Sequence, residues 1–126
     1  MDIERLIVNL TRATQVDWID DHAVARAVGW DIRFGSWYSP EAVRDARKRR
    51  RALREVADPV ELPRFTQEIG AAMSLFPADW PKRLIMTWQH GATWKIEFWI
   101  GKTRHELVHS LLPVGLCIAA LKVRAA

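Results

Sequence analysis

The stretch RLIMTWQHGATWKIEFWIG, residues 83–101, contains the clearest β-hairpin pattern in the chain and determines the predicted fold. Apolar and polar residues alternate in both halves, which is the period of two expected for a half-buried antiparallel pair. The two apolar rows share one face only if Trp88 lies opposite Trp94, and this register requires a loop of odd length, most simply His90 to Ala92. The remaining pairs are then Met86 with Ile96 and Leu84 with Phe98.

Helical patterns surround the hairpin. Four segments have apolar residues at helical spacing together with residues typical of helix ends. They are residues 2–12, 17–29, 65–76 and 114–124. A short strand is expected at 30–34, where apolar and charged residues alternate. We therefore predict one α+β domain over residues 1–126, with helices packed on a small antiparallel sheet centred on the hairpin.

The composition excludes several classes of protein. With 126 residues, of which 49% are hydrophobic, the chain is long enough to bury a core. No stretch of the sequence reaches the roughly 18 uninterrupted apolar residues that a membrane span needs. Charged residues interrupt the apolar ones at the N-terminus, unlike in a signal peptide. Cys117 is the only cysteine, so the chain forms no internal disulfide. We expect a cytoplasmic protein without a membrane partner.

The positive charge excess of the chain lies in one segment. Ser39, Pro40 and Glu41 are typical of a helix start, and we expect one helix over residues 40–57. This basic segment contains seven cations and three carboxylates, a surplus of four that equals the net charge of the whole chain. The cations are Arg44, Arg47, Lys48, Arg49, Arg50, Arg51 and Arg54.

The basic segment is the main candidate binding site. Its cations could neutralise several phosphates and bind nucleic acid in a salt-sensitive way, or they could bind an acidic protein surface. Trp37 and Tyr38 directly precede the segment and could add aromatic contacts. The alternative is a solvated helix stabilised by local ion pairs. Those pairs would join Asp45 to Arg49 and Arg51 to Glu55.

Three stretches of the chain resemble a family of small phage and prophage proteins, the phage ABA sandwich domain. They are the start of the chain, MDIERLIVNLTRAT with DDHAVARAVGW, then PRFTQEIGAAMSLFPADW at 63–80, and Pro113 with LCIAAL at 116–121. The resemblance implies an α/β/α-type sandwich. Ile85 and Trp99 lie on the more polar face of the hairpin, and they need either a second helical layer, as such a sandwich would supply, or a partner. It implies a phage or prophage origin, makes residues 104–109 a third strand, and provides no catalytic residues.

The sequence His105-Glu106-Leu107-Val108-His109 matches H-E-x-x-H, the signature of zinc hydrolases. On a helix, His105 and His109 would share a face and bind zinc, while Glu106 would activate the bound water. On a strand, the two histidines would lie about 13 Å apart at ~3.3 Å per residue, too far to bind one metal. We therefore expect no cofactor and no catalytic residue, with a zinc-dependent hydrolase or peptidase as the alternative.

The leading hypothesis is a small phage or prophage accessory protein that acts by non-catalytic binding. Its basic segment would contact nucleic acid or an acidic host protein, in the cytoplasm of a bacterial host. A host-directed role against a defence system is an extrapolation from the implied origin and has no residue-level argument.

Overall fold

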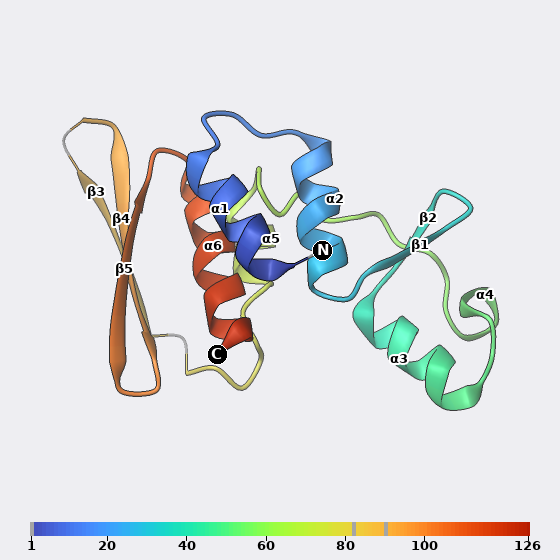
Figure 1. Ribbon diagram of the computed structural model, residues 1–126. Coiled ribbons are helices and arrows are strands. Elements are labelled where there is room, and N and C mark those ends of the chain that lie inside the picture. The colour runs from blue at the N-terminus through green and yellow to red at the C-terminus, as the bar shows by residue number, and fades with distance from the viewer. Residues whose placement is uncertain (1, 82, 90) are drawn as a thin grey trace.

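The computed structural model describes residues 2–81, 83–89 and 91–126. A three-stranded antiparallel sheet has the order β3 (Leu84–Gln89), β4 (Thr93–Ile100) and β5 (Thr103–His109). Figure 1 shows α1 (Ile3–Arg12) and α6 (Leu112–Ala125) beside this sheet, and α2 (Trp18–Ala27) and α5 (Ile69–Met73) farther from it. The predicted α+β class, with helices packed on a small antiparallel sheet, is confirmed. None of the described helices is both long and apolar enough to cross a bilayer.

The register of the central hairpin is the one that its alternation predicts. Trp88 pairs with Trp94, and the other two predicted pairs are also present. The strands end at Gln89 and begin again at Thr93, which leaves a three-residue loop whose first residue, His90, lies outside the described residues. The two tryptophan rings meet edge to face with centroids 5.1 Å apart, but the Trp88 side chain is 56% exposed, because it lies on the edge strand.

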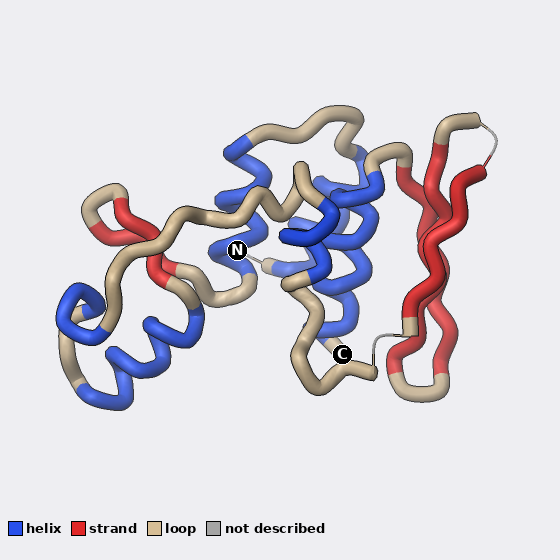
Figure 2. The backbone as a smooth tube through the Cα atoms, turned by 180° about the vertical axis from the view of Figure 1, so that it is seen from behind, coloured by secondary structure: helices blue, strands red, loops and turns tan. Residues whose placement is uncertain are grey.

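Helices cover one face of the three-stranded sheet, as the two opposite views show (Figures 1 and 2). The covered face includes Ile96 and Phe98, which are fully buried. The other face carries the half-exposed Ile85 and Val108, and the second helical layer of a three-layer sandwich is not formed by the described part of the chain. The sheet and its helices are therefore a two-layer arrangement.

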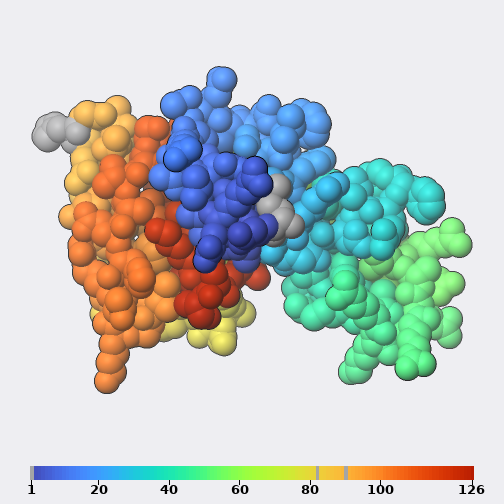
Figure 3. All heavy atoms as spheres, in the orientation of Figure 1, coloured from blue at the N-terminus to red at the C-terminus, as the bar shows by residue number. Residues whose placement is uncertain are grey.

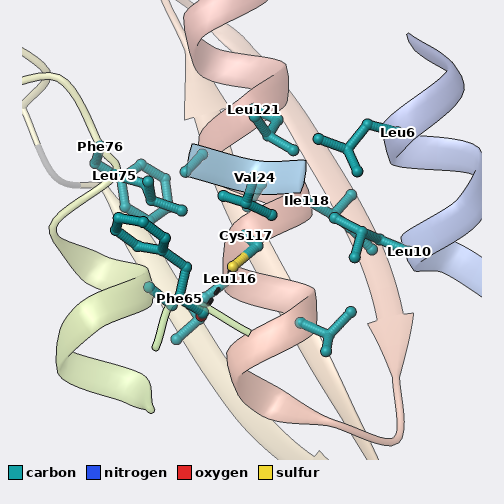
Figure 4. Packing of buried hydrophobic residues seen from close by; sticks show 14 of the residues in the cluster. Leu6, Leu10, Val24, Phe65, Leu75, Phe76, Leu116, Cys117, Ile118 and Leu121 are labelled. Atoms are coloured by element: carbon teal, nitrogen blue, oxygen red, sulfur yellow. Dashed lines mark hydrogen bonds between the residues drawn. The ribbon is translucent and has the colours of Figure 1, made fainter. Parts of the chain in front are cut away.

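Helix α6 forms the centre of the hydrophobic core. Its residues from Val114 to Leu121 are all buried, which explains why this helix is apolar all round instead of amphipathic. In Figure 4, Cys117 lies among side chains of α1, α2 and the segment around Phe65, and its thiol donates to the Phe65 carbonyl oxygen at 3.0 Å. Burial raises the pKa of the Cys117 thiol. This cysteine is therefore a packing residue.

A buried carboxylate joins α2 to the segment before α5. Asp21 is 3% exposed and accepts three hydrogen bonds, from the Thr66 backbone N–H at 2.8 Å, the Thr66 hydroxyl at 2.6 Å and the Gln67 amide at 2.6 Å. The turn that these bonds stabilise replaces the first part of the helix expected at 65–76, of which only Ile69–Met73 is helical. Asp21 is therefore a buried structural carboxylate, although it lies in the first turn of α2.

A smaller unit lies at the end of the molecule away from the sheet. We define this lobe as residues 31–56, which contain the strands β1 (Asp31–Arg33) and β2 (Ser36–Tyr38) and the helices α3 (Pro40–Arg49) and α4 (Leu53–Val56). In the space-filling view its cyan and green atoms project to one side (Figure 3). Trp37 links it to the body, because its ring packs edge to face on His22 with centroids 4.8 Å apart.

Candidate anion-binding site

The predicted helix over 40–57 is broken into α3 and α4. The Ser39 hydroxyl accepts a hydrogen bond from the Ala42 N–H at 3.3 Å, which confirms the expected N-cap. The helix ends at Arg50, which has a left-handed backbone with φ of +54°. The Arg51 N–H then bonds to the Ala46 carbonyl at 3.0 Å, as in a Schellman C-cap, so the chain turns sharply in the middle of the basic segment.

The strand expected at 30–34 is instead the first half of a second hairpin. β1 and β2 are joined by the two-residue turn Phe34-Gly35, in which both residues have positive φ, +51° and +81°. Such a turn matches the twist of the paired strands, and Asn-Gly or Gly-Gly is its usual sequence. Phe34 was expected to belong to the strand at 30–34, but it lies in the turn and its side chain is fully exposed.

The hairpin and the broken helix line a cavity of about 660 Å³ that is open to solvent, which we call the arginine cavity. Five arginines line it, Arg33, Arg47, Arg50, Arg51 and Arg54. Phe34 and Tyr38 line it from the hairpin, and Asp31 is the only acidic residue in its lining. On a continuous helix, Arg47, Arg50, Arg51 and Arg54 would share one convex face, since residues three and four apart are neighbours there. The break at Arg50 folds α4 back toward the hairpin and makes the surface that they line concave.

The arginines of this cavity are mostly free of carboxylates. Arg33 pairs with Asp31 at 3.1 Å, whereas no carboxylate lies within 4 Å of the other four guanidinium groups in the described part of the chain. The predicted ion pair of Asp45 with Arg49 is present at 3.0 Å, and Arg44 pairs with Glu41 at 3.7 Å, but neither arginine lines the cavity. The predicted pair of Arg51 with Glu55 is not formed, because Glu55 accepts the Ala52 N–H at 3.3 Å. The positive charge excess is therefore concentrated at the cavity.

The two aromatic residues suspected from the sequence have different positions. Trp37 is 8% exposed, and its carbonyl accepts a hydrogen bond from the Val60 N–H at 3.0 Å, so this residue, proposed from the sequence as a binding residue, is buried. Tyr38 is 6% exposed and lines the arginine cavity. Among the aromatic residues that line the cavity, Phe34 is the exposed one, and the Phe-Gly dipeptide between two short alternating runs is the sequence signal that could have located it.

The H-E-x-x-H motif lies on strand β5, so it lacks the helical geometry of zinc hydrolases. The His105 ring stacks on Phe98 at 5.3 Å, and Glu106 is on the opposite face of the strand, 2.9 Å from Arg104. A hydrogen bond from Arg104 also lowers the pKa of the neighbouring Glu97. The described residues contain no group of three or more potential ligands that could hold a metal ion.

His109 is buried between two helix ends and uses both of its ring nitrogens. Its Nδ1 accepts the Leu111 N–H at 2.9 Å, so the proton is on Nε2, which donates to the Leu10 carbonyl oxygen at 2.9 Å. These bonds join the end of α1 to the start of α6. His109 is therefore a structural residue in this conformation.

The arrangement of the arginine cavity is suited to binding an anion. A guanidinium group is planar and donates two parallel hydrogen bonds to a phosphate or a carboxylate, and several such groups around one concave surface hold a multiply charged ligand. The chain matches no protein-family model, no curated protein and no solved structure.

Proposed function

We propose that this protein binds nucleic acid without catalysis, through the arginine cavity and the exposed cations around it. The observation that supports the proposal is the concentration of five arginines around one cavity, four of them without a carboxylate within 4 Å among the described residues. Each cation that neutralises a phosphate releases condensed counterions, so these side chains would supply most of the binding free energy.

The aromatic residue at the cavity favours nucleic acid over an acidic protein as the partner. Carboxylate side chains need only positive charge, whereas nucleotides combine a phosphate with a flat base that stacks on exposed aromatic rings. Phe34 is fully exposed beside the arginines, where it packs against no core residue. An acidic host protein remains the competing partner in the experiment below.

The origin and the cellular role form a second part of the proposal. The resemblance of three stretches to the phage ABA sandwich domain supports a phage or prophage accessory protein. Such a protein would act on nucleic acid in the cytoplasm of a bacterial host, and a counter-defence role would fit that origin.

Fluorescence anisotropy with a labelled 12-nucleotide strand, over a salt series, tests the nucleic-acid proposal. We expect the slope of log K against log salt to fall by roughly 1.4 in the double variant Arg47→Ser/Arg51→Ser, since each phosphate contact to a single strand contributes about 0.7. The matched control is Arg5→Ser/Arg12→Ser, which removes the same charge from exposed positions of α1 and should change the slope much less.

Two results would contradict the proposal. One is equal loss of affinity in both double variants, which would indicate a diffuse charge effect with no role for the cavity. The other is failure of the wild-type protein to bind the strand at low salt. If a glutamate-rich peptide then bound with dependence on Arg47 and Arg51, the partner would be an acidic protein.

A further inference from the structure

We infer that the arginine cavity recognises an unpaired nucleotide, with a backbone phosphate among the guanidinium groups and the adjacent base stacked on Phe34. This inference rests on the proposed function and adds a specificity, the discrimination of single strands from duplexes. It depends on the shape of the cavity, on the exposure of Phe34 and on the backbone at two of its lining residues.

The shape of the cavity favours a flexible strand. Its volume of about 660 Å³ is in the range of small-molecule sites and is sufficient for one nucleotide. The hairpin lines one side and α3 and α4 line the other, so a phosphate must enter a recess between them. A single strand can direct one phosphate into such a recess, whereas the regular backbone of a duplex rests on the outer rim.

The exposed ring of Phe34 adds the second contact. Its side chain is fully exposed and lines the cavity, so an aromatic face is available beside the phosphate site. Within a duplex, both faces of each base are covered by its stacked neighbours, and only an unpaired or terminal base can stack on a protein ring. Phe34 therefore contacts a base only when the bound nucleic acid is single-stranded.

The backbone at two lining residues indicates that these side chains are not present for stability. Phe34 and Arg50 have φ of +51° and +54°, a region that glycine and asparagine occupy at much lower cost than other residues. Phe34 buries no surface in compensation, and Arg50 is also exposed. Both residues instead line the arginine cavity.

This geometry supplies test variants that retain the fold. Phe34→Asn and Arg50→Gly each place a residue that suits the left-handed backbone while removing the ring or the guanidinium group. We expect Phe34→Asn to weaken binding to the 12-nucleotide strand about tenfold and to change binding to the matching 12-base-pair duplex less than twofold. We expect Arg50→Gly, like Phe34→Asn, to weaken binding to the single strand more than binding to the duplex.

Lys48→Ser is the matched control. Lys48 is exposed on α3, two residues from Arg50, and does not line the cavity, so its removal should weaken both probes equally and leave their ratio unchanged. Thermal unfolding of each variant confirms that the chain is folded. The measured quantity is the ratio of the affinity for the single strand to the affinity for the duplex. This ratio is compared between the wild-type protein and the two cavity variants.

The outcomes separate this inference from the proposed function. Equal affinity of the wild-type protein for strand and duplex, or an unchanged ratio in Phe34→Asn, would overturn the inference and leave nucleic-acid binding intact. Absence of binding to both probes would overturn both. The inference is supported if the ratio of single-strand to duplex affinity falls in Phe34→Asn and Arg50→Gly and is unchanged in Lys48→Ser.

Discussion

The packing of α6 on the sheet at Gly115 predicts that Gly115→Ala destabilises the protein. Gly115 lies near the start of α6, where a Cβ atom would be 2.5 Å from Cδ1 of Ile96. The same Cβ would be 3.4 Å from atoms of both His109 and Leu107, so it would have neighbours on more than one side. Ile96 is fully buried and has little space for another rotamer.

Two opposing effects determine the magnitude. Replacing glycine by alanine inside a helix lowers the free energy of the folded state by about 1 kcal/mol. Overpacking of a well-packed core costs typically about 1–3 kcal/mol, and a contact that must lengthen by about 1 Å within a buried site lies at the upper end. We therefore expect a net loss of about 1–2 kcal/mol, which lowers the Tm by roughly 3–10 °C for a chain of this size.

A double-mutant cycle with Ile96→Val tests this explanation by urea unfolding. Ile96→Val removes the Cδ1 atom and alone should cost about 0.5–1.5 kcal/mol. In the double variant the new Cβ occupies the vacated space, so the combined loss should be smaller than the sum by about 1 kcal/mol or more. A stabilised Gly115→Ala protein, or losses that add within about 0.5 kcal/mol, would refute the reasoning.

Three further predictions concern the buried and the strained residues. Burial raises the pKa of Cys117, so above about pH 8.5 the thiol ionises first in the unfolded chain, and stability should fall by up to about 1.4 kcal/mol per pH unit. Urea unfolding from pH 8 to 10 should show a weaker decline in Cys117→Ala, and parallel curves would contradict this. Asp21→Asn replaces one of the two accepting oxygens by an N–H₂ group, which faces the donors of Thr66 or the donor of Gln67, and should cost about 1–3 kcal/mol in the same assay, while a neutral result would argue against the buried network. Arg50→Gly should raise the free energy of unfolding by about 0.5–1 kcal/mol because it relieves the left-handed backbone, and a loss of stability would show that the arginine side chain supports the turn.

The sequence by itself determined the features that depend on neighbouring residues. The period of two, together with the requirement that both apolar rows face one side, was sufficient to establish the pairing of Trp88 with Trp94. The N-caps Asp17 and Ser39 act within two or three residues of their own position, so they were also predictable. The surplus of positive charge in the basic segment is a property of composition alone.

Tertiary structure alone decided the shape of the candidate site. Arginine and lysine are good helix formers, so no local signal marks the break at Arg50, which forms where the segment folds back toward the β1–β2 hairpin. Phe34 has the alternation of a core residue, but the two-residue turn directs it to solvent. His105 and His109 share a face on a helix and on a strand alike, and pairing of Phe98 with His105 and Trp94 with His109 made this segment the third strand. Local patterns therefore determined which elements form, and long-range packing determined which side chains meet, because contacts between distant segments depend on how the whole chain encloses its core.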